Sequence, residues 1–533
     1  MCGIIGLFTK EELGIHVAGE LNTALTMLQH RGQDACGITT CDGQQVRTVK
    51  DNGLVSEVFN QNNLAKLTGY YGIGHVRYPT AGSPDRNEAQ PFFTNYPYGI
   101  ALAHNGNLIN CDELRQRLLC ALRCINTTSD SELMLNVFAE ELERHIDRSS
   151  AEEGKMPLPT LDNLWDSVHE TMSLVRGGYA VVVLIKGIGM LVFRDPHGIR
   201  PLCFGTRRDE NGNIIEFAAA SESVAIEAIG LDRERDVGAG EVLFLDMNMQ
   251  LHTHTDALAC ALQPCIFEYV YLARPDSVMD NISVYEARVQ MGVRLAERVH
   301  RLRVLEEGER AVVVDEGDVG YDASLPCLEK MIDVVMAVPD TSRHTAISIA
   351  TTLGKKYIEG LSKNRYIART FIMPAQQMRQ KSIRIKHNPI HDAVKGLSVL
   401  VVDDSIVRGN TTRMLVKAIL QAGAKHVFVA SAAPPVRFCN VYGIDMPTTK
   451  ELIAHSLTPC EVAKVIDAEY VLYQSLEDLK RACRDAEIYG PGPKDFECSC
   501  FDGVYITGGV DQAYLDKLEA ARIDSAKAKS GSA

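Results

Sequence analysis

The chain begins MCGIIGLF (residues 1–8), and this stretch decides how its N-terminal half is interpreted. If Met1 is removed, Cys2 carries a thiol and a free α-amino group a few bonds apart. Such an amine has a pKa of roughly 7.7–8.0, which suits a base near neutral pH. A nucleophile beside its own base is the arrangement that hydrolases with an N-terminal Thr or Cys use. The alternative is a small buried residue in a first β-strand, since free cysteines are usually inert core residues.

The overall composition is that of a globular protein with more than one domain, because the chain has 533 residues, 46% hydrophobic and 23% charged. Its longest apolar stretch, residues 179–193, is interrupted and too short to span a membrane. The net charge of −14 argues against a nucleic-acid partner. The N-terminus has no basic region followed by an apolar core, so we expect no secretory signal. Fifteen cysteines without such a signal indicate reduced thiols in the cytoplasm.

The pattern of predicted elements changes near residue 263. Before it, short strands with Gly-bearing turns alternate with helices, predicted at residues 21–29 and 131–142. After it, apolar strands at residues 333–338, 397–402 and 427–430 are separated by helices, predicted at 344–353 and 411–422. Continuous apolar strands between helices predict a parallel sheet, whose ligands bind at the carboxyl ends of the strands.

Four residues in the first half suit a zwitterionic amino-acid substrate at Cys2. The Asn105 amide and the Gly106 backbone N–H can stabilise a developing oxyanion. Arg77 can hold a substrate carboxylate bidentately. Asp130 can hold the substrate ammonium, although a helix N-cap is the better interpretation when Ser129-Asp130 is taken alone.

Five motifs in order carry a resemblance: MCGIIG, LQHRGQDACGI (28–38), GHVRYPTAG (74–82), HNGNL (104–108) and SDSE (129–132). Together they resemble a class II glutamine amidotransferase domain over about residues 2–240. The resemblance implies the N-terminal-nucleophile fold, an αββα sandwich. It also implies Cys2 as nucleophile, Asn105 and Gly106 as the oxyanion hole, and Arg77, Asp130, Arg31 and Thr80 as glutamine ligands.

The second strong signal is VVDDSIVRGNTT (401–412). Two adjacent carboxylates that leave a buried strand suit ribose hydroxyls or a hydrated Mg²⁺. Gly409 lets the backbone approach a ligand closely, and Thr411 and Thr412 offer hydroxyl and N–H groups at a helix N-terminus. The alternative is a turn followed by a helix cap.

This run resembles the phosphoribosyl pyrophosphate motif of type I phosphoribosyltransferases, except that Asn410 stands where a Thr is more usual. In that family an acidic pair binds ribose, the next loop binds the 5′-phosphate, and Mg²⁺ joins the pyrophosphate. The turn at 339–342 matches the pyrophosphate loop and the basic segment 363–386 the mobile lid. The resemblance implies a phosphoribosyl pyrophosphate site made of Asp340, Thr341, Ser342, Lys363, Asp403, Asp404, Ser405, Arg408, Gly409, Asn410, Thr411 and Thr412. The implied Mg²⁺ ligands are Thr341, Asp403 and Asp404, and Tyr366 and Phe371 are candidates for lining an ammonia path.

A glutaminase half joined to such a half resembles the amidophosphoribosyltransferase family of purine synthesis. The expected division is a glutamine amidotransferase domain at 2–262, an α/β type I phosphoribosyltransferase domain with a parallel sheet at 263–515, and a disordered tail at 516–533. The implied reaction converts glutamine, water and phosphoribosyl pyrophosphate to 5-phosphoribosylamine, glutamate and pyrophosphate. One alternative is another class II amidotransferase, which would lack VVDDSIVRGNTT. The other is a non-catalytic regulator that senses phosphoribosyl pyrophosphate, which would not need Cys2, Arg77, Asn105 and Asp130 together.

The cysteine spacing speaks against the [4Fe–4S] cluster that some members of this family bind. Cys265 stands at one ligand position, but the second falls at Asn440, and Cys498-Ser499-Cys500 lacks the Cys-x-x-Cys spacing. Because ligation needs four correctly placed sulfurs, we expect no cluster. Members of the family are oligomeric and inhibited by purine nucleotides, so we expect a homo-oligomer (dimer or tetramer) with feedback inhibition.

Overall fold

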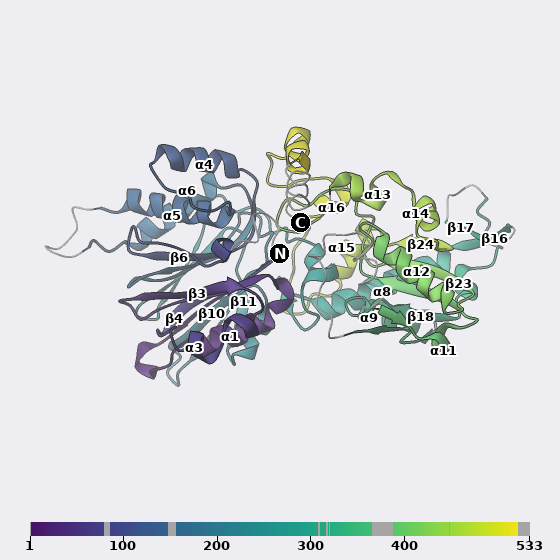
Figure 1. The fold of residues 1–533 in the computed structure, drawn as a ribbon, viewed down its shortest axis with the longest axis horizontal. Coiled ribbons are helices and arrows are strands. Elements are labelled where there is room, and N and C mark those ends of the chain that lie inside the picture. Colours follow the sequence, from purple (N-terminus) through teal and green to yellow (C-terminus); the bar gives the residue numbers. More distant parts are fainter. Residues whose placement is uncertain are drawn as a thin grey trace.

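The computed structural model describes residues 2–78, 86–147, 156–307, 310–315, 318, 320–364, 387–446 and 448–520. It has two parts side by side, the first built on two antiparallel sheets and the second on a parallel sheet (Figure 1). We call them the sandwich half and the parallel-sheet half.

The first strand of the chain occupies the middle of a seven-stranded antiparallel sheet. Its side chains are buried on both faces, because helices cover one face and a second sheet covers the other. The strands lie in the order β11 (Asp232–Asp236), β9 (Cys203–Arg208), β10 (Ile214–Ala220), β1 (Gly3–Thr9), β4 (Tyr71–Arg77), β2 (Ala35–Cys41) and β3 (Val46–Asn52).

The second sheet has six antiparallel strands and faces the first. Its order is β13 (Leu251–Thr255), β12 (Glu241–Asp246), β8 (Gly189–Arg194), β7 (Gly177–Ile185), β6 (Ile100–Leu108) and β5 (Phe92–Thr94). One apolar core lies between the sheets, and one lies under the helices on each outer face. Those helices are α1 (Ala18–Met27) and α7 (Ser223–Ala228) on the first sheet, and α4 (Cys111–Cys120), α5 (Asp130–His145) and α6 (Leu161–Leu174) on the second. The predicted αββα sandwich is therefore confirmed.

The parallel-sheet half is built on five strands, all parallel, as the apolar strands predict. Their order is β19 (Lys356–Tyr357), β18 (Val334–Ala337), β22 (Ser398–Asp403), β23 (His426–Ser431) and β24 (Tyr470–Tyr473). One face packs against α8 (Val284–Arg301), α9 (Arg343–Thr352) and α15 (Leu476–Arg484). The other packs against α11 (His391–Val394), α12 (Asn410–Gln421) and α14 (Pro459–Val465).

Two further segments complete the description. In the acidic region 305–328 the chain forms a hairpin of β16 (Arg303–Glu307) and β17 (Arg310–Val314). The described part of the expected disordered tail, residues 516–520, is helical, and 521–533 lie outside the described residues. Within the described chain, no helix is both long and apolar enough to cross a membrane.

Candidate functional site

Cys2 and Asn105 meet where β1 begins and β6 nears its end. The backbone N–H of Cys2 donates to Asn105 Oδ1 at 3.3 Å, and Cys2 Sγ lies 3.8 Å from the carbonyl oxygen of Tyr78. Both residues are buried. Asn105 Nδ2 is also buried and has no hydrogen-bond partner among the described residues. An unsatisfied buried donor beside a thiol is the feature that an oxyanion hole requires.

Arg77 ends β4 and is buried close to Asp34. Burial raises the pKa of the Asp34 carboxyl, and the charge of Arg77 partly opposes this shift. The backbone comes equally close at Gly32, where a Cβ atom would stand 2.6 Å from the N and C atoms of Arg77. The end of β4 is therefore held firmly against the segment that follows η2 (Gln29–Arg31).

Asp130 is the first residue of α5, but it is not the helix cap. Ser129 is the N-cap, and its hydroxyl accepts from the N–H of Ser131 at 3.3 Å. The Asp130 carboxylate accepts from the backbone N–H of Leu108 at 3.1 Å, two residues beyond Gly106 on β6. The carboxylate is thus fixed beside the end of the strand that carries Asn105, and the N-cap interpretation holds for Ser129 but not for Asp130.

Two further expected glutamine ligands are not placed at the site. The Arg31 guanidinium is fully buried and bonds the carboxylates of Glu222 and Glu268, so its charge is already matched. These pairs engage the Arg31 side chain in the structure, and its role as a glutamine ligand stays a prediction. Thr80 lies outside the described residues.

The pairs of Arg31 belong to a buried charge network between the two halves, which the sequence motifs did not reveal. Glu268 also accepts from Arg200, and Glu222 accepts from His30 and Ser277. Burial alone would raise the pKa of Glu222, but Arg31 and His30 outweigh it and hold that pKa well below its usual value. Glu222 is therefore charged, and both acids have structural partners.

The two polar loops predicted to meet at the sheet edge do meet. They follow β18 and β22, which are hydrogen-bonded neighbours. The Thr341 hydroxyl donates to Asp404, and the Ser405 hydroxyl donates to the same carboxylate at 3.0 Å. The turn at 339–342 and the acidic pair thus form one site at the carboxyl end of the sheet.

The acidic pair has the electrostatics of a cation or hydroxyl site. Burial, and then the neighbouring charge of Asp404, raise the pKa of Asp403 well above its usual value. A bound divalent cation or hydrogen-bond donors would relieve this cost of ionisation. The donor set of two carboxylates and a threonine hydroxyl fits Mg²⁺, which prefers hard oxygen ligands.

The loop after the acidic pair ends at Gly409, the N-cap of α12, which has a left-handed φ of 72°. Asn410 and Thr411 are exposed at the start of this helix, whereas Thr412 is buried. A Cβ atom on Gly409 would stand 2.5 Å from Ile453 Cδ1. The left-handed backbone and the contact with Ile453 therefore both favour glycine at this position. The close approach of a ligand, which the sequence suggested as the reason, stays a prediction.

Several other residues expected at the phosphoribosyl pyrophosphate site already bond other groups of the protein. The Ser342 hydroxyl is buried and donates to the carbonyl of Val338. Only the backbone of Ser342 therefore remains to contact a ligand. Lys363 pairs with Asp340, which ties the start of the basic segment to the turn. Arg408 is exposed and lies 3.3 Å from Glu451. Tyr366 and Phe371 lie outside the described residues.

Other clusters lie apart from these sites. In the described chain, His300, Cys327 and Glu329 form the one group whose possible metal-ligand atoms all lie within 4.8 Å. The His300 ring already lies 2.7 Å from the Glu329 carboxylate. The Cys327 thiol already donates to the His300 carbonyl at 2.8 Å. The group is at the base of the β16–β17 hairpin and includes none of the expected Mg²⁺ ligands.

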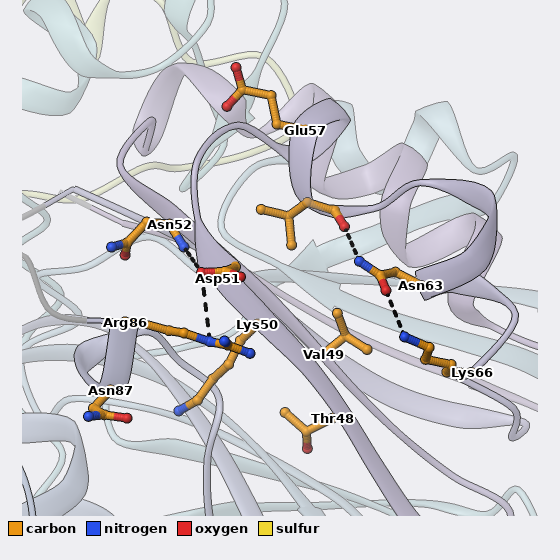
Figure 2. Close-up of a pocket in the computed structure, with 11 residues that line it drawn as sticks. Thr48, Val49, Lys50, Asp51, Asn52, Glu57, Asn63, Lys66, Arg86 and Asn87 are labelled. Atoms are coloured by element: carbon orange, nitrogen blue, oxygen red, sulfur yellow. Dashed lines mark hydrogen bonds and ion pairs between the residues drawn. The ribbon is translucent and has the colours of Figure 1, made fainter.

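A surface cavity of about 780 Å³ lies along the edge strand β3 (Figure 2). Its polar side chains are largely bonded to the protein itself: Asn63 accepts from Lys66, and Lys50 donates to the carbonyls of Ala89 and Pro91. Burial lowers the pKa of Lys50 to about 8. The cavity contains none of the residues expected at either site.

The comparisons with known proteins agree with this geometry. A family model described as "Glutamine amidotransferase domain" matches residues 80–228. An amidophosphoribosyltransferase of Escherichia coli is 48% identical, over 99% of this chain and 97% of its own length. A solved glutamine phosphoribosylpyrophosphate amidotransferase from Bacillus subtilis, complexed with ADP and GMP, has a TM-score of 0.76 at 32% identity and covers 96% of this chain and 98% of its own. A second structure, described as the allosteric regulatory enzyme of purine biosynthesis, has a TM-score of 0.78 at 32% identity and covers 97% and 99%.

The fold and the two sites define a glutamine amidotransferase joined to a phosphoribosyltransferase. The relationship covers 97–98% of the length of two curated relatives and not only the motifs. The chain belongs to the amidophosphoribosyltransferase family, enzymes of the first step of purine biosynthesis.

Proposed function

We propose that the chain uses Cys2 to release ammonia from glutamine and the acidic pair Asp403-Asp404 to deliver it to phosphoribosyl pyrophosphate. The products are 5-phosphoribosylamine, glutamate and pyrophosphate. The observation that carries the proposal is the buried Asn105 Nδ2 beside Cys2, which has no hydrogen-bond partner in the described part of the chain. It is supported by the shared site that the 339–342 turn and the acidic pair form at the sheet edge.

In the first step Cys2 Sγ attacks the side-chain amide carbon of glutamine. After removal of Met1, the free α-amine of Cys2 accepts the thiol proton and returns it to the departing ammonia. The oxyanion is stabilised by Asn105 Nδ2 and the Gly106 N–H, while Arg77 and Asp130 hold the substrate carboxylate and ammonium. Water then hydrolyses the thioester and releases glutamate.

In the second step ammonia attacks C1 of the ribose and pyrophosphate leaves. Asp403 and Asp404 accept hydrogen bonds from the ribose hydroxyls. The 5′-phosphate binds Ser405, Arg408, Gly409, Asn410, Thr411 and Thr412 at the N-terminus of α12, where backbone N–H groups attract anions. Asp340, Thr341, Ser342 and Lys363 hold the pyrophosphate side, and Tyr366 and Phe371 line the ammonia path. Mg²⁺ held by Thr341, Asp403 and Asp404 would neutralise pyrophosphate charge when bound.

We further propose the setting in which this enzyme works. All fifteen cysteines are in the described residues and each is a free thiol, which suits a reducing cytoplasm. The ADP and GMP of the Bacillus subtilis structure support purine nucleotides as feedback inhibitors. We propose a homo-oligomer, and domains that divide near residue 262.

The test is a pair of assays on purified protein. Cys2→Ala should abolish phosphoribosylamine formation from glutamine and leave formation from added ammonia intact, because the synthase site is unchanged. Asp404→Asn should impair both reactions. Cys124→Ala, at an exposed cysteine, is the control and should impair neither.

Three outcomes would contradict the proposal. If Cys2→Ala still forms phosphoribosylamine from glutamine, Cys2 is not the nucleophile. A product that does not depend on phosphoribosyl pyrophosphate would indicate another class II amidotransferase. Absence of both reactions in the wild-type protein, with retained ligand binding, would indicate a non-catalytic regulator.

A further inference from the structure

The proposed oxyanion segment touches the other half of the molecule. Asn105, Gly106 and Asn107 are on β6, where they pair with Ala180, Tyr179 and Gly178 of β7. A Cβ atom on Gly106 would stand 2.0 Å from the carbonyl oxygen of Gly178, so β7 fixes this strand tightly on one side.

The same peptide also lies against residues 440–444, a loop of the parallel-sheet half that we call the backing loop. A Cβ atom on Gly443 would stand 3.0 Å from both C and O of Gly106 and 3.2 Å from its Cα. The side-chain amide of Asn107 donates to the carbonyl of Val441 at 2.9 Å. A side chain at Gly443 would therefore require the Gly106 peptide to shift by a few tenths of an ångström.

The backing loop is itself rigid. The buried side chain of Asn440 accepts from the N–H groups of Tyr442 and Ile444, at 2.9 and 3.2 Å. Tyr442 is fully buried, and a Cβ atom on Gly178 would stand 3.1 Å from Tyr442 Cβ. The backing loop therefore packs against both β6 and β7, close to Asn105 and Gly106 on β6.

We propose that Gly443 and Asn107 are positioning residues for the glutaminase reaction, which the sandwich half cannot complete alone. This inference rests on the proposed role of Asn105 and Gly106. An oxyanion hole acts through donors held about 2.7–3.1 Å from the developing charge, so a small displacement of the Gly106 peptide is sufficient to weaken it. Neither positioning residue touches the substrate in this proposal; each acts through the peptide of Gly106.

The first experiment is Gly443→Ala, which adds a methyl group at a φ of 104° against Gly106. Loss of one oxyanion donor lowers kcat by about 10²–10³-fold, and a loss of this size is expected for glutaminase kcat, with little change in the KM for glutamine. Formation of phosphoribosylamine from added ammonia should persist. Gly396→Ala is the matched control, because Gly396 has a φ of 76° with no heavy atom within 4 Å of an added Cβ.

A binding measurement separates positioning from general damage. The γ-semialdehyde of glutamate forms a hemithioacetal with a thiol, so its oxygen tests the oxyanion hole, whereas glutamate tests only the ground-state site. In Gly443→Ala the aldehyde should bind weakly in proportion to the loss of kcat, and glutamate should bind normally. Asn107→Ala, which removes the bonds of the side-chain amide to the carbonyls of Val441 and Leu108, should show the same pattern with a smaller loss.

The outcomes distinguish this inference from the proposed function. If Cys2→Ala abolishes glutaminase but Gly443→Ala and Asn107→Ala keep the wild-type kcat, the positioning role is wrong and the proposed function stands. If both variants lose the glutamine and ammonia reactions equally, the residues serve only general folding and the inference is overturned. If Cys2→Ala keeps glutaminase activity, the proposed function itself fails.

Discussion

The Nη2 atom of Arg31 lies 2.8 Å from Oε2 of Glu268, and this buried pair joins the sandwich half to the segment that leads into the parallel-sheet half. Arg200 bonds the same carboxylate. Two arginines from one half therefore depend on one acid that follows residue 262. A buried pair of this kind is costly to break because the remaining charge stays away from water.

Glu268→Gln should therefore destabilise the whole molecule, by about 3–5 kcal/mol for a broken buried pair. The melting temperature of purified protein would show this loss. The control is Lys517→Ala, which breaks an exposed pair with Asp112 that also joins the two halves, and which should cost less than about 1 kcal/mol. Equal melting temperatures for Glu268→Gln and the wild type would mean that the pair does not stabilise the interface.

Glu222 should make stability depend on pH in the acid range. Its folded-state pKa is held below the usual value of about 4.3, so its contribution is present above that pH and is lost as pH falls through the folded-state pKa. The difference in melting temperature between the wild type and Glu222→Gln should be largest above about pH 5 and shrink toward pH 3. Glu477→Gln, at an exposed pair with Arg481, should show a small difference at all pH values. A Glu222→Gln difference that grows on acidification would contradict the assignment.

Asp403→Asn should stabilise the protein while it removes activity. The folded-state pKa of Asp403 is raised, so the protonated form is favoured in the fold, and stability is lost as pH rises from about 3.9 through the folded-state value. Asparagine can still accept from the N–H of Asp404, at 3.0 Å in the wild type, without a buried charge. The melting temperature of the variant should exceed that of the wild type at pH 8 and match it near pH 4.

Two measurements check this prediction further. Mg²⁺ should raise the melting temperature of the wild type more than that of Asp403→Asn, since a cation relieves the same repulsion. Asp392→Asn, at an exposed carboxylate on α11, should behave like the wild type. If Asp403→Asn is less stable than the wild type at pH 8, then the ionised Asp403 carboxylate does not lower the stability of the fold.

Gly409→Ala should weaken binding of phosphoribosyl pyrophosphate. A methyl group here meets a left-handed φ and stands 2.5 Å from Ile453 Cδ1, so the backbone is strained and either the loop or the Ile453 side chain must shift. The KM for phosphoribosyl pyrophosphate should rise about tenfold or more, a change of ~1.4 kcal/mol, with glutamine or with ammonia as donor. Gly354→Ala has a similar φ of 62° with open space around it, and should show only the backbone cost. An equal KM in the two variants would mean that contact with Ile453 does not place the loop.

Much of the architecture follows from local pattern. The buried strands β18, β22 and β23 are continuous apolar runs in the sequence, and parallel strands must bring their carboxyl ends to one edge. That geometry is why the turn at 339–342 and the acidic pair could be placed together before the structure was known. The sandwich was predicted mainly from motifs, because its short strands carry little periodic signal.

The contacts between the halves could not be predicted in this way. Arg31 stands near Cys2 in the sequence motifs, which suggested a substrate ligand, yet its partner Glu268 is 237 residues away. The contact of Gly443 with Gly106 joins positions that are even further apart along the chain. Neither pairing produces a local pattern of hydrophobicity or turns, so only the packed structure reveals it.

The apolar core beneath α8 and α9 also contains Ile109 and Ile199, which come from the sandwich half. Ile109 directly follows β6 and Ile199 lies between β8 and β9. The sandwich half therefore shares an apolar core with the parallel-sheet half, and separating the two would expose apolar side chains. Anyone who transplants it onto a different synthase must also supply an apolar surface for these two side chains, or redesign them as polar residues.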